Sequence, residues 1–90
     1  MAVLRCEAEI RNSKGLHARA AARFCKTAEQ FEADIKVRRG DTEVSGRSIM
    51  GLMMLAAAQG TCIEISAAGE DADAAMAALV SLVENKFDEE

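Results

Sequence analysis

His17 is the only histidine of the chain and the side chain best suited to nucleophilic chemistry. It follows the turn residue Gly15 and stands where an expected helix begins. The first backbone N–H groups of a helix have no intrahelical acceptor, and the helix dipole places partial positive charge there. A phosphoryl group on the imidazole would therefore find donors in the backbone N–H of Ala18 and in the guanidinium of Arg19. Imidazole is a good nucleophile near neutral pH, because an appreciable fraction of it is unprotonated.

The position of His17 alone does not establish such a role, since a histidine at a helix start is more often a cap or a surface residue. The sequence offers no second base and no carboxylate pair for acid–base catalysis. It also has no C-x-x-C or Cys/His cluster, so we expect neither a metal nor a cofactor. Cys6, Cys25 and Cys62 are odd in number and far apart, and we interpret them as buried, reduced thiols.

The composition excludes several classes of protein. A chain of 90 residues that is half apolar fits a single domain, residues 1–90, with a core built mainly from aliphatic side chains. A net charge of −4 argues against nucleic acid as a partner. No run of about 18 apolar residues is present, and the charged N-terminus does not resemble a signal peptide. We therefore expect no membrane insertion and a cytoplasmic location.

Hydrophobic periodicity predicts the elements that would position His17. Alternating residues predict strands at 3–10, 33–38, from 42 onward and at 61–66. Helical spacing predicts helices at 18–30 and 72–86, with a short helix after an N-cap at Ser48. Residues 88–90 are expected to fray. The order β-α-β-β-α-β-α predicts an α+β fold, an open-faced sandwich of a four-stranded antiparallel sheet with three helices on one face.

Three motifs, in order along the chain, resemble those of the HPr family, the histidine-containing phosphocarriers of the bacterial phosphoenolpyruvate-dependent phosphotransferase system. Lys14-Gly15-Leu16-His17-Ala18-Arg19 resembles the family's active-site signature. Ser48-Ile49-Met50-Gly51-Leu52-Met53 resembles its regulatory-serine segment. Gln59-Gly60-Thr61, followed by Gly69-Glu70-Asp71, resembles its last strand and turn. The matches cover nearly the whole chain, and the fold they imply is HPr-like.

The resemblance implies a phosphoryl carrier with a covalent phosphohistidine rather than a stand-alone enzyme. Enzyme I would phosphorylate His17 at Nδ1, and His17 would pass the group to a histidine of an enzyme IIA-type domain. Arg19 and the backbone N–H of Ala18 would stabilise the phosphoryl group, and the carrier is expected to be a monomer. One departure from the family is Ala20, where proline is usual; proline would stiffen the first turn, whereas alanine only favours the helix.

Ser48 has two interpretations. Its residue type and position predict an N-cap. The resemblance adds a regulatory phosphorylation site for an HPr kinase/phosphorylase, and a phosphate there would be tolerated at a helix start.

The apolar run after Ser48 cannot face inward along its whole length, so one or two of its large side chains should be exposed. Methionines suit a surface that must fit two dissimilar partners. With the outer stripe of the first helix, they predict a docking surface for partner proteins, formed by Ala22, Arg23, Lys26, Ile49, Met50 and Met53.

The sequence leaves more than one role open for the protein. The acidic ending and Glu29 on the outer face of the helix resemble a regulatory, nitrogen-type branch with its own enzyme I. The Ser48 segment is more like that of a kinase-regulated HPr, and the alternative role is an HPr that serves sugar transport. A non-catalytic, ferredoxin-like regulatory binding module has a similar element order, but it would not be modified at His17. An acyl-carrier role for Ser48 is disfavoured, because an Asp-Ser-Leu setting is missing.

Overall fold

Strands and helices follow one another in the order that the sequence pattern predicts. The computed structural model describes residues 2–89. The strands are β1 (Val3–Glu9), β2 (Asp34–Arg39), β3 (Thr42–Ser45) and β4 (Cys62–Ala68). The helices are α1 (Ala18–Ala28), α2 (Ile49–Met54) and α3 (Ala72–Glu84), and a single turn, η1 (Lys86–Asp88), follows α3.

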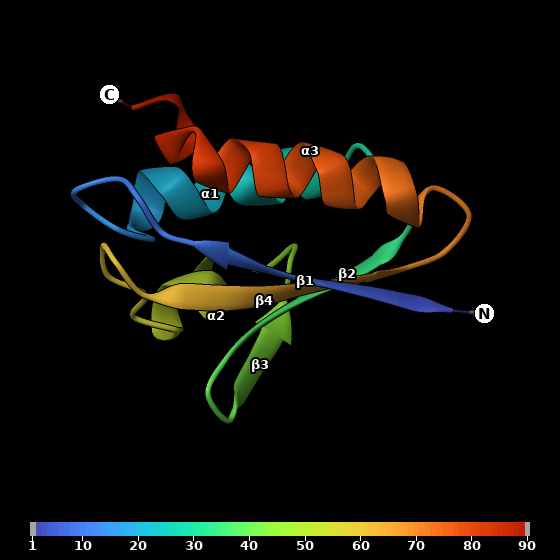
Figure 1. The fold of residues 1–90 in the computed structure, drawn as a ribbon, viewed down its shortest axis with the longest axis horizontal. Coiled ribbons are helices and arrows are strands. Elements are labelled where there is room, and N and C mark those ends of the chain that lie inside the picture. Colours follow the sequence, from blue (N-terminus) through green and yellow to red (C-terminus); the bar gives the residue numbers. More distant parts are fainter. Residues whose placement is uncertain (1, 90) are drawn as a thin grey trace.

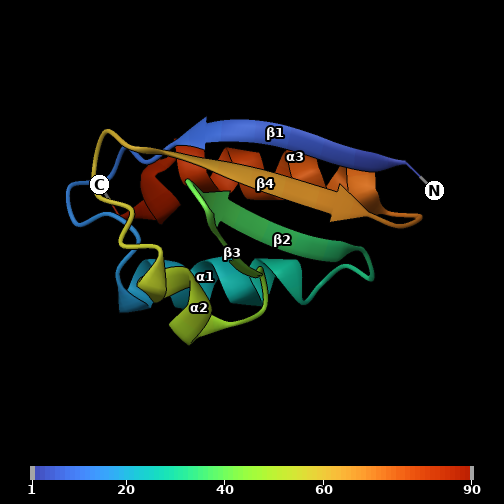
Figure 2. The same cartoon turned by 90° about the horizontal axis from the view of Figure 1, so that it is seen from below.

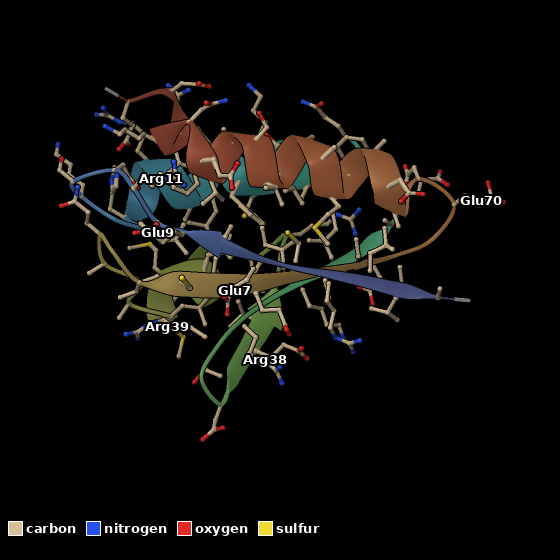
Figure 3. The ribbon with its side chains drawn as sticks, viewed as in Figure 1. Glu7, Glu9, Arg11, Arg38, Arg39 and Glu70 are labelled. Carbon is tan, nitrogen blue, oxygen red and sulfur yellow. The ribbon has the colours of Figure 1, made fainter. Side chains whose placement is uncertain are left out.

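The four strands form one antiparallel sheet in the order β1-β4-β2-β3. Helices α1 and α3 lie side by side over one face of this sheet (Figure 1). The short helix α2 packs against α1, next to β3 (Figure 2). Glu7 and Arg38 lie on the opposite, open side (Figure 3), where Arg38 pairs with Glu64 at 3.0 Å. The predicted open-faced sandwich is confirmed.

The core lies between the sheet and the two long helices. Alternation in β4 turns Ile63 and Ile65 inward, where they are fully buried with Phe24 of α1 and Leu79 of α3. Phe87 of η1 is also fully buried and extends this core beyond the end of α3. The core is therefore aliphatic with a few phenylalanines, as the composition predicts. Ile10 and Ala20, which lie before and after His17, are fully buried in it.

Two expectations from the sequence are wrong. Residues 88 and 89 are not frayed: the chain turns back at Phe87, and Glu89 makes hydrogen bonds to residues far away in the sequence. Glu90 lies outside the described residues.

The expectation that all three cysteines are buried is the second that is wrong. Cys62 is exposed and Cys6 is half-buried, so Cys25 is the buried thiol among the three. Burial raises the pKa of Cys25, with a smaller contribution from Glu29. Cys62 alternates with Ile63 onto the open face of the sheet.

None of the helices within residues 2–89 combines the length and the apolar character that crossing a membrane requires.

Candidate active site around His17

His17 occupies the N-cap position of α1, with extended backbone angles of φ −83° and ψ −178°. Its side chain makes no capping hydrogen bond, although an N-cap side chain often satisfies one of the first N–H groups of a helix. Ala18 and Arg19 are exposed, and their backbone N–H groups have no intrahelical acceptor. The structure therefore places the imidazole at the start of α1, with two helix-end N–H groups next to it in the chain. Their role in holding a phosphoryl group stays a prediction.

Backbone contacts hold the loop before His17 in place. Gly15 has φ +67°, and a Cβ built on it would lie 2.6 Å from the carbonyl oxygen of Ala57. Its own carbonyl oxygen accepts hydrogen bonds from the backbone N–H of His17 at 2.9 Å and from the amide of Asn12 at 2.8 Å. The N–H of Leu16 donates to the carbonyl oxygen of Ala57 at 2.9 Å. Only glycine fits this close approach in the left-handed region, and it places His17 beside the segment that follows α2.

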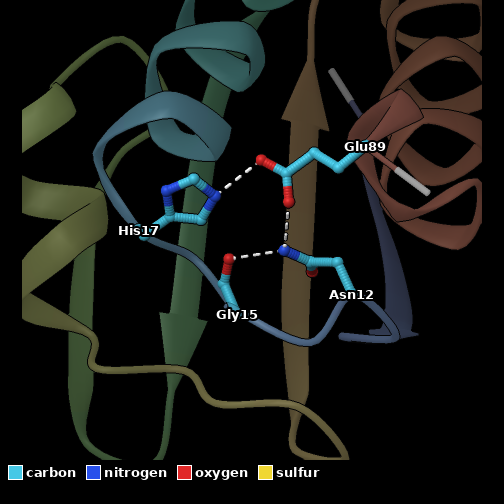
Figure 4. A network of polar contacts seen from close by, with 4 residues as sticks. All are labelled: Asn12, Gly15, His17 and Glu89. Atoms are coloured by element: carbon cyan, nitrogen blue, oxygen red, sulfur yellow. Dashed lines mark hydrogen bonds and ion pairs between the residues drawn. The ribbon is translucent and has the colours of Figure 1, made fainter.

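The imidazole of His17 contacts a carboxylate from the far end of the chain. Its Nε2 atom lies 2.6 Å from Oε2 of Glu89, and the amide Nδ2 of Asn12 donates to Oε1 of Glu89 at 2.9 Å (Figure 4). Burial by itself would raise the pKa of the Glu89 carboxyl. Hydrogen bonds from Asn12 and His17, together with the charges of His17 and Arg19, outweigh burial and lower that pKa below its usual range.

The turn η1 carries Glu89 to His17. Lys86, Phe87 and Asp88 all have positive φ, between 54° and 61°, and this reverses the chain after α3. L-residues in the left-handed region are disfavoured by roughly 1–2 kcal/mol each, so such a turn persists only where its surroundings hold it. The fully buried Phe87 side chain supplies that hold. Asp88 adds an exposed contact to Arg23 at 3.9 Å, which is too long and too hydrated to contribute much.

Arg19 lies beside Glu89. The two residues border a hollow of about 110 Å³, together with Ser13 and Lys14. The hollow thus combines two cationic side chains with one carboxylate, next to the helix start. Contacts among the described residues do not join the guanidinium of Arg19 to the imidazole of His17, so the stabilising role predicted for Arg19 stays a prediction.

Ser48 and the apolar run after it are placed in part as expected. The N-cap is confirmed, because Oγ of Ser48 accepts a hydrogen bond from the backbone N–H of Gly51 at 2.9 Å. Leu52 and Leu55 turn into the core. The exposed side chains are more numerous than the one or two expected: Met50 is 76% exposed and Met54 74%, while Ile49 and Met53 are each 43% exposed.

These apolar side chains of α2 lie next to the outer stripe of α1, because the two helices pack together. In that stripe Arg23 and Lys26 are exposed and Ala22 is half-buried. The six residues predicted to bind partners therefore belong to two helices that pack together, and their role in docking stays a prediction. Met54 is a further exposed apolar side chain of α2, although the sequence does not predict it as part of the docking surface.

Two residues of the site, Asn12 and Glu89, are not among those that the sequence predicts. The side chain of Asn12 is fully buried and joins the His17 loop to Glu89. Glu89 was assigned to a frayed tail. The one available signal was Phe87, a large apolar residue among charged ones, which indicated that the chain end is anchored.

Comparison with known proteins gives consistent results. The family model described as "PTS HPr component phosphorylation site" matches residues 4–85. The chain is 49% identical to Phosphocarrier protein HPr of Neisseria meningitidis, covering 97% of this chain and 98% of that protein. It is 42% identical to Phosphocarrier protein NPr of Shewanella violacea, with 99% and 98% covered. The crystal structure of HPr-C-His from Thermoanaerobacter tengcongensis superimposes with a TM-score of 0.88 at 44% identity, covering 100% of this chain and 99% of that one.

Proposed function

The chain belongs to the HPr family, the phosphocarrier proteins of the phosphotransferase system, and we propose that His17 is the residue that carries the phosphoryl group. The observation that carries this assignment is the orientation of its ring. Nε2 is engaged by Glu89, whereas Nδ1 points away from Glu89 (Figure 4) and no capping bond occupies the side chain. The side chain of His17 is 26% exposed, so a donor protein can reach it.

Transfer to His17 requires a lone pair and a way to hold negative charge. The Nδ1 lone pair forms the new N–P bond, while the bond between phosphorus and the donor breaks and its electron pair stays with the donor. Phosphoryl transfer is helped chiefly by positioning and by charge stabilisation. The backbone N–H of Ala18 and the guanidinium of Arg19 supply that stabilisation at the helix start. The reverse step returns the electron pair to Nδ1 and delivers the group to the next carrier.

The donor is then phospho-enzyme I, which draws the group from phosphoenolpyruvate, and the acceptor is a histidine of an enzyme IIA-type protein. Both act in the cytoplasm. One copy of the chain suffices for the relay, because Asn12, His17 and Glu89 come from the same chain. Residues 1–90 act as a single HPr-type domain.

Incubation with phosphoenolpyruvate and purified enzyme I tests the assignment. Wild-type protein should acquire one acid-labile phosphate, and His17→Ala should acquire none. Far-ultraviolet circular dichroism of His17→Ala controls for folding, since the side chain is partly exposed and caps nothing. Absence of label on the wild type, or equal label on His17→Ala, would show that His17 is not the carrier residue.

We further propose that both partners dock on the surface formed by Ala22, Arg23, Lys26, Ile49, Met50 and Met53. Ile49, Met50 and Met53 are exposed apolar side chains of α2, which packs against the helix that begins after His17. Exposed apolar patches mark interaction sites. Met50→Glu should weaken the binding of enzyme I strongly. Val3→Glu is the matched control, because Val3 is 45% exposed on the edge strand β1. Equal affinity of both variants would contradict this docking surface.

The regulatory, nitrogen-type branch is the role that we propose within the phosphotransferase system. The similarity to Phosphocarrier protein NPr over nearly the whole chain supports it. The higher identity to Phosphocarrier protein HPr favours the alternative, an HPr that serves sugar transport. Rates of phosphorylation by a sugar-type and a nitrogen-type enzyme I discriminate the two, and faster transfer from the sugar-type enzyme would overturn the regulatory assignment.

Ser48 is proposed as a second phosphorylation site, for an HPr kinase/phosphorylase. Its half-buried hydroxyl is bound to a backbone N–H at the start of α2, where a phosphate would retain a donor. Treatment with the kinase and ATP should label the wild type and leave Ser48→Ala unlabelled. Label on both proteins or on neither would contradict the proposal.

A further inference from the structure

We propose that Glu89 is a positioning residue for phosphoryl transfer: its carboxylate keeps the ring proton of His17 on Nε2 and thereby reserves the lone pair of Nδ1 for the incoming phosphorus. This inference rests on the proposed function of His17. It assigns a task to the end of the chain, where the carboxylate of Glu89 lies 2.6 Å from the imidazole.

The contact distance, together with an ionised Glu89 carboxylate, indicates which ring nitrogen carries the proton. An ionised carboxylate is an acceptor only, and so is an unprotonated ring nitrogen. Two acceptors at 2.6 Å would repel each other, so a hydrogen must lie between Nε2 and Oε2. A neutral imidazole carries one ring proton. With that proton on Nε2, Nδ1 is left with a free lone pair on the side of the ring that faces away from Glu89 (Figure 4).

The carboxylate is held for this task by residues from two other parts of the chain. The amide of Asn12, which is fully buried, donates to Oε1 of Glu89 and leaves Oε2 for His17. The same amide donates to the carbonyl oxygen of Gly15, so one side chain sets the distance between the His17 loop and Glu89. From the other side, the buried Phe87 and the three left-handed residues of η1 place Glu89. A backbone turn of this kind persists only when its surroundings determine it.

The same proton matters once the group is bound. Attack by Nδ1 on phosphorus forms the N–P bond and leaves the ring with a positive charge, because Nε2 keeps its hydrogen. The Glu89 carboxylate neutralises that charge at short range. In the onward step the N–P electron pair returns to Nδ1 and the ring is again neutral. A cationic ring is the better leaving group, so Glu89 keeps the phosphoryl group both bound and transferable.

A direct test compares wild type with Glu89→Gln and Glu89→Ala. Because His17 is the only histidine, two-bond ¹H–¹⁵N correlation spectra of ¹⁵N-histidine-labelled protein report its tautomer without ambiguity. We expect the neutral ring of the wild type to carry its proton on Nε2 and both variants to gain a population protonated on Nδ1. Loss of a charge-assisted hydrogen bond changes such a ratio by about tenfold or more. The rate of phosphorylation by phospho-enzyme I should fall by about tenfold.

Glu84→Gln is the matched control, since Glu84 is exposed at the end of α3 and the charge change is the same. It should alter neither the tautomer nor the rate. An unchanged tautomer, or an unchanged rate, in both Glu89 variants would overturn the role of Glu89 while leaving His17 as the carrier. If the wild type itself is not phosphorylated, the proposed function of His17 fails first, and the tautomer spectra still report whether Glu89 orders the ring.

Discussion

Gly15→Ala should destabilise the protein far more than Gly40→Ala, although both glycines have nearly the same backbone conformation. Gly15 has φ +67° and Gly40 has φ +62°. Either alanine would meet a left-handed strain of roughly 1–2 kcal/mol, partly offset by about 0.4–1 kcal/mol from the less flexible unfolded chain. We therefore expect Gly40→Ala, whose Cβ has nothing within 4 Å, to cost about 1 kcal/mol or less.

The two sites differ in what the new methyl group meets. At Gly15 the Cβ would lie 2.6 Å from the carbonyl oxygen of Ala57 and 3.0 Å from the Cα of Ala58, so backbone must move. That movement stretches or breaks the 2.9 Å hydrogen bond from Leu16 to Ala57, worth about 1 kcal/mol, and adds overpacking of about 1–3 kcal/mol. The free energy of unfolding should thus fall by about 2–5 kcal/mol for Gly15→Ala.

Urea unfolding followed by circular dichroism measures both variants, and thermal unfolding gives a second readout. In a domain of this size 1 kcal/mol corresponds to roughly 4–8 °C in Tm. Gly15→Ala should also be phosphorylated more slowly, because the displaced loop carries His17, whereas Gly40→Ala should react as the wild type does. Equal midpoints for the two variants would refute the argument that the close approach to Ala57, rather than φ alone, requires glycine.

Three further changes test other parts of the structure. Phe87→Ala should lower the free energy of unfolding by about 3 kcal/mol and release Glu89 from His17, because the ring is fully buried; unchanged urea midpoints and His17 spectra would contradict this anchor. Acidification should cost the wild type more stability than Glu89→Gln. The pKa of Glu89 is lowered in the folded state, so its stabilising contribution is complete above about pH 4.3 and is lost as pH falls through the lower value; parallel acid-unfolding curves would contradict this. Ser48→Ala should cost about 1 kcal/mol, measured by urea unfolding, because it removes the cap on Gly51, and Ser48→Asn should restore most of it.

Much of the fold is encoded in patterns that span a few residues. The period of two in Cys62–Ala68 and the helical spacing of Ala21, Phe24, Cys25 and Ala28 specify which element forms and which side turns inward. The N-cap at Ser48 and the turn at Gly40 are equally local. Such features could be predicted because the interactions that produce them join residues close together in the chain.

The candidate site likewise has a part that depends on neighbouring residues and a part that depends on residues far apart in the chain. The position of His17 at a helix start, with Ala18 and Arg19 next to it, follows from local sequence, and the structure has His17 at this position. The surroundings of the imidazole do not follow in this way. Glu89 is 72 residues from His17 and 77 from Asn12, and no short-range pattern pairs them.

By itself, then, the sequence determined the helices and strands, their order along the chain and the place of the imidazole at the start of a helix. Only the tertiary structure decided what the imidazole contacts, because that depends on how the chain reverses at Phe87 and where its end returns. A charged residue near a terminus is ordinarily hydrated and free to move. Here the buried ring of Phe87 and the buried side-chain amide of Asn12 hold the Glu89 carboxylate against His17.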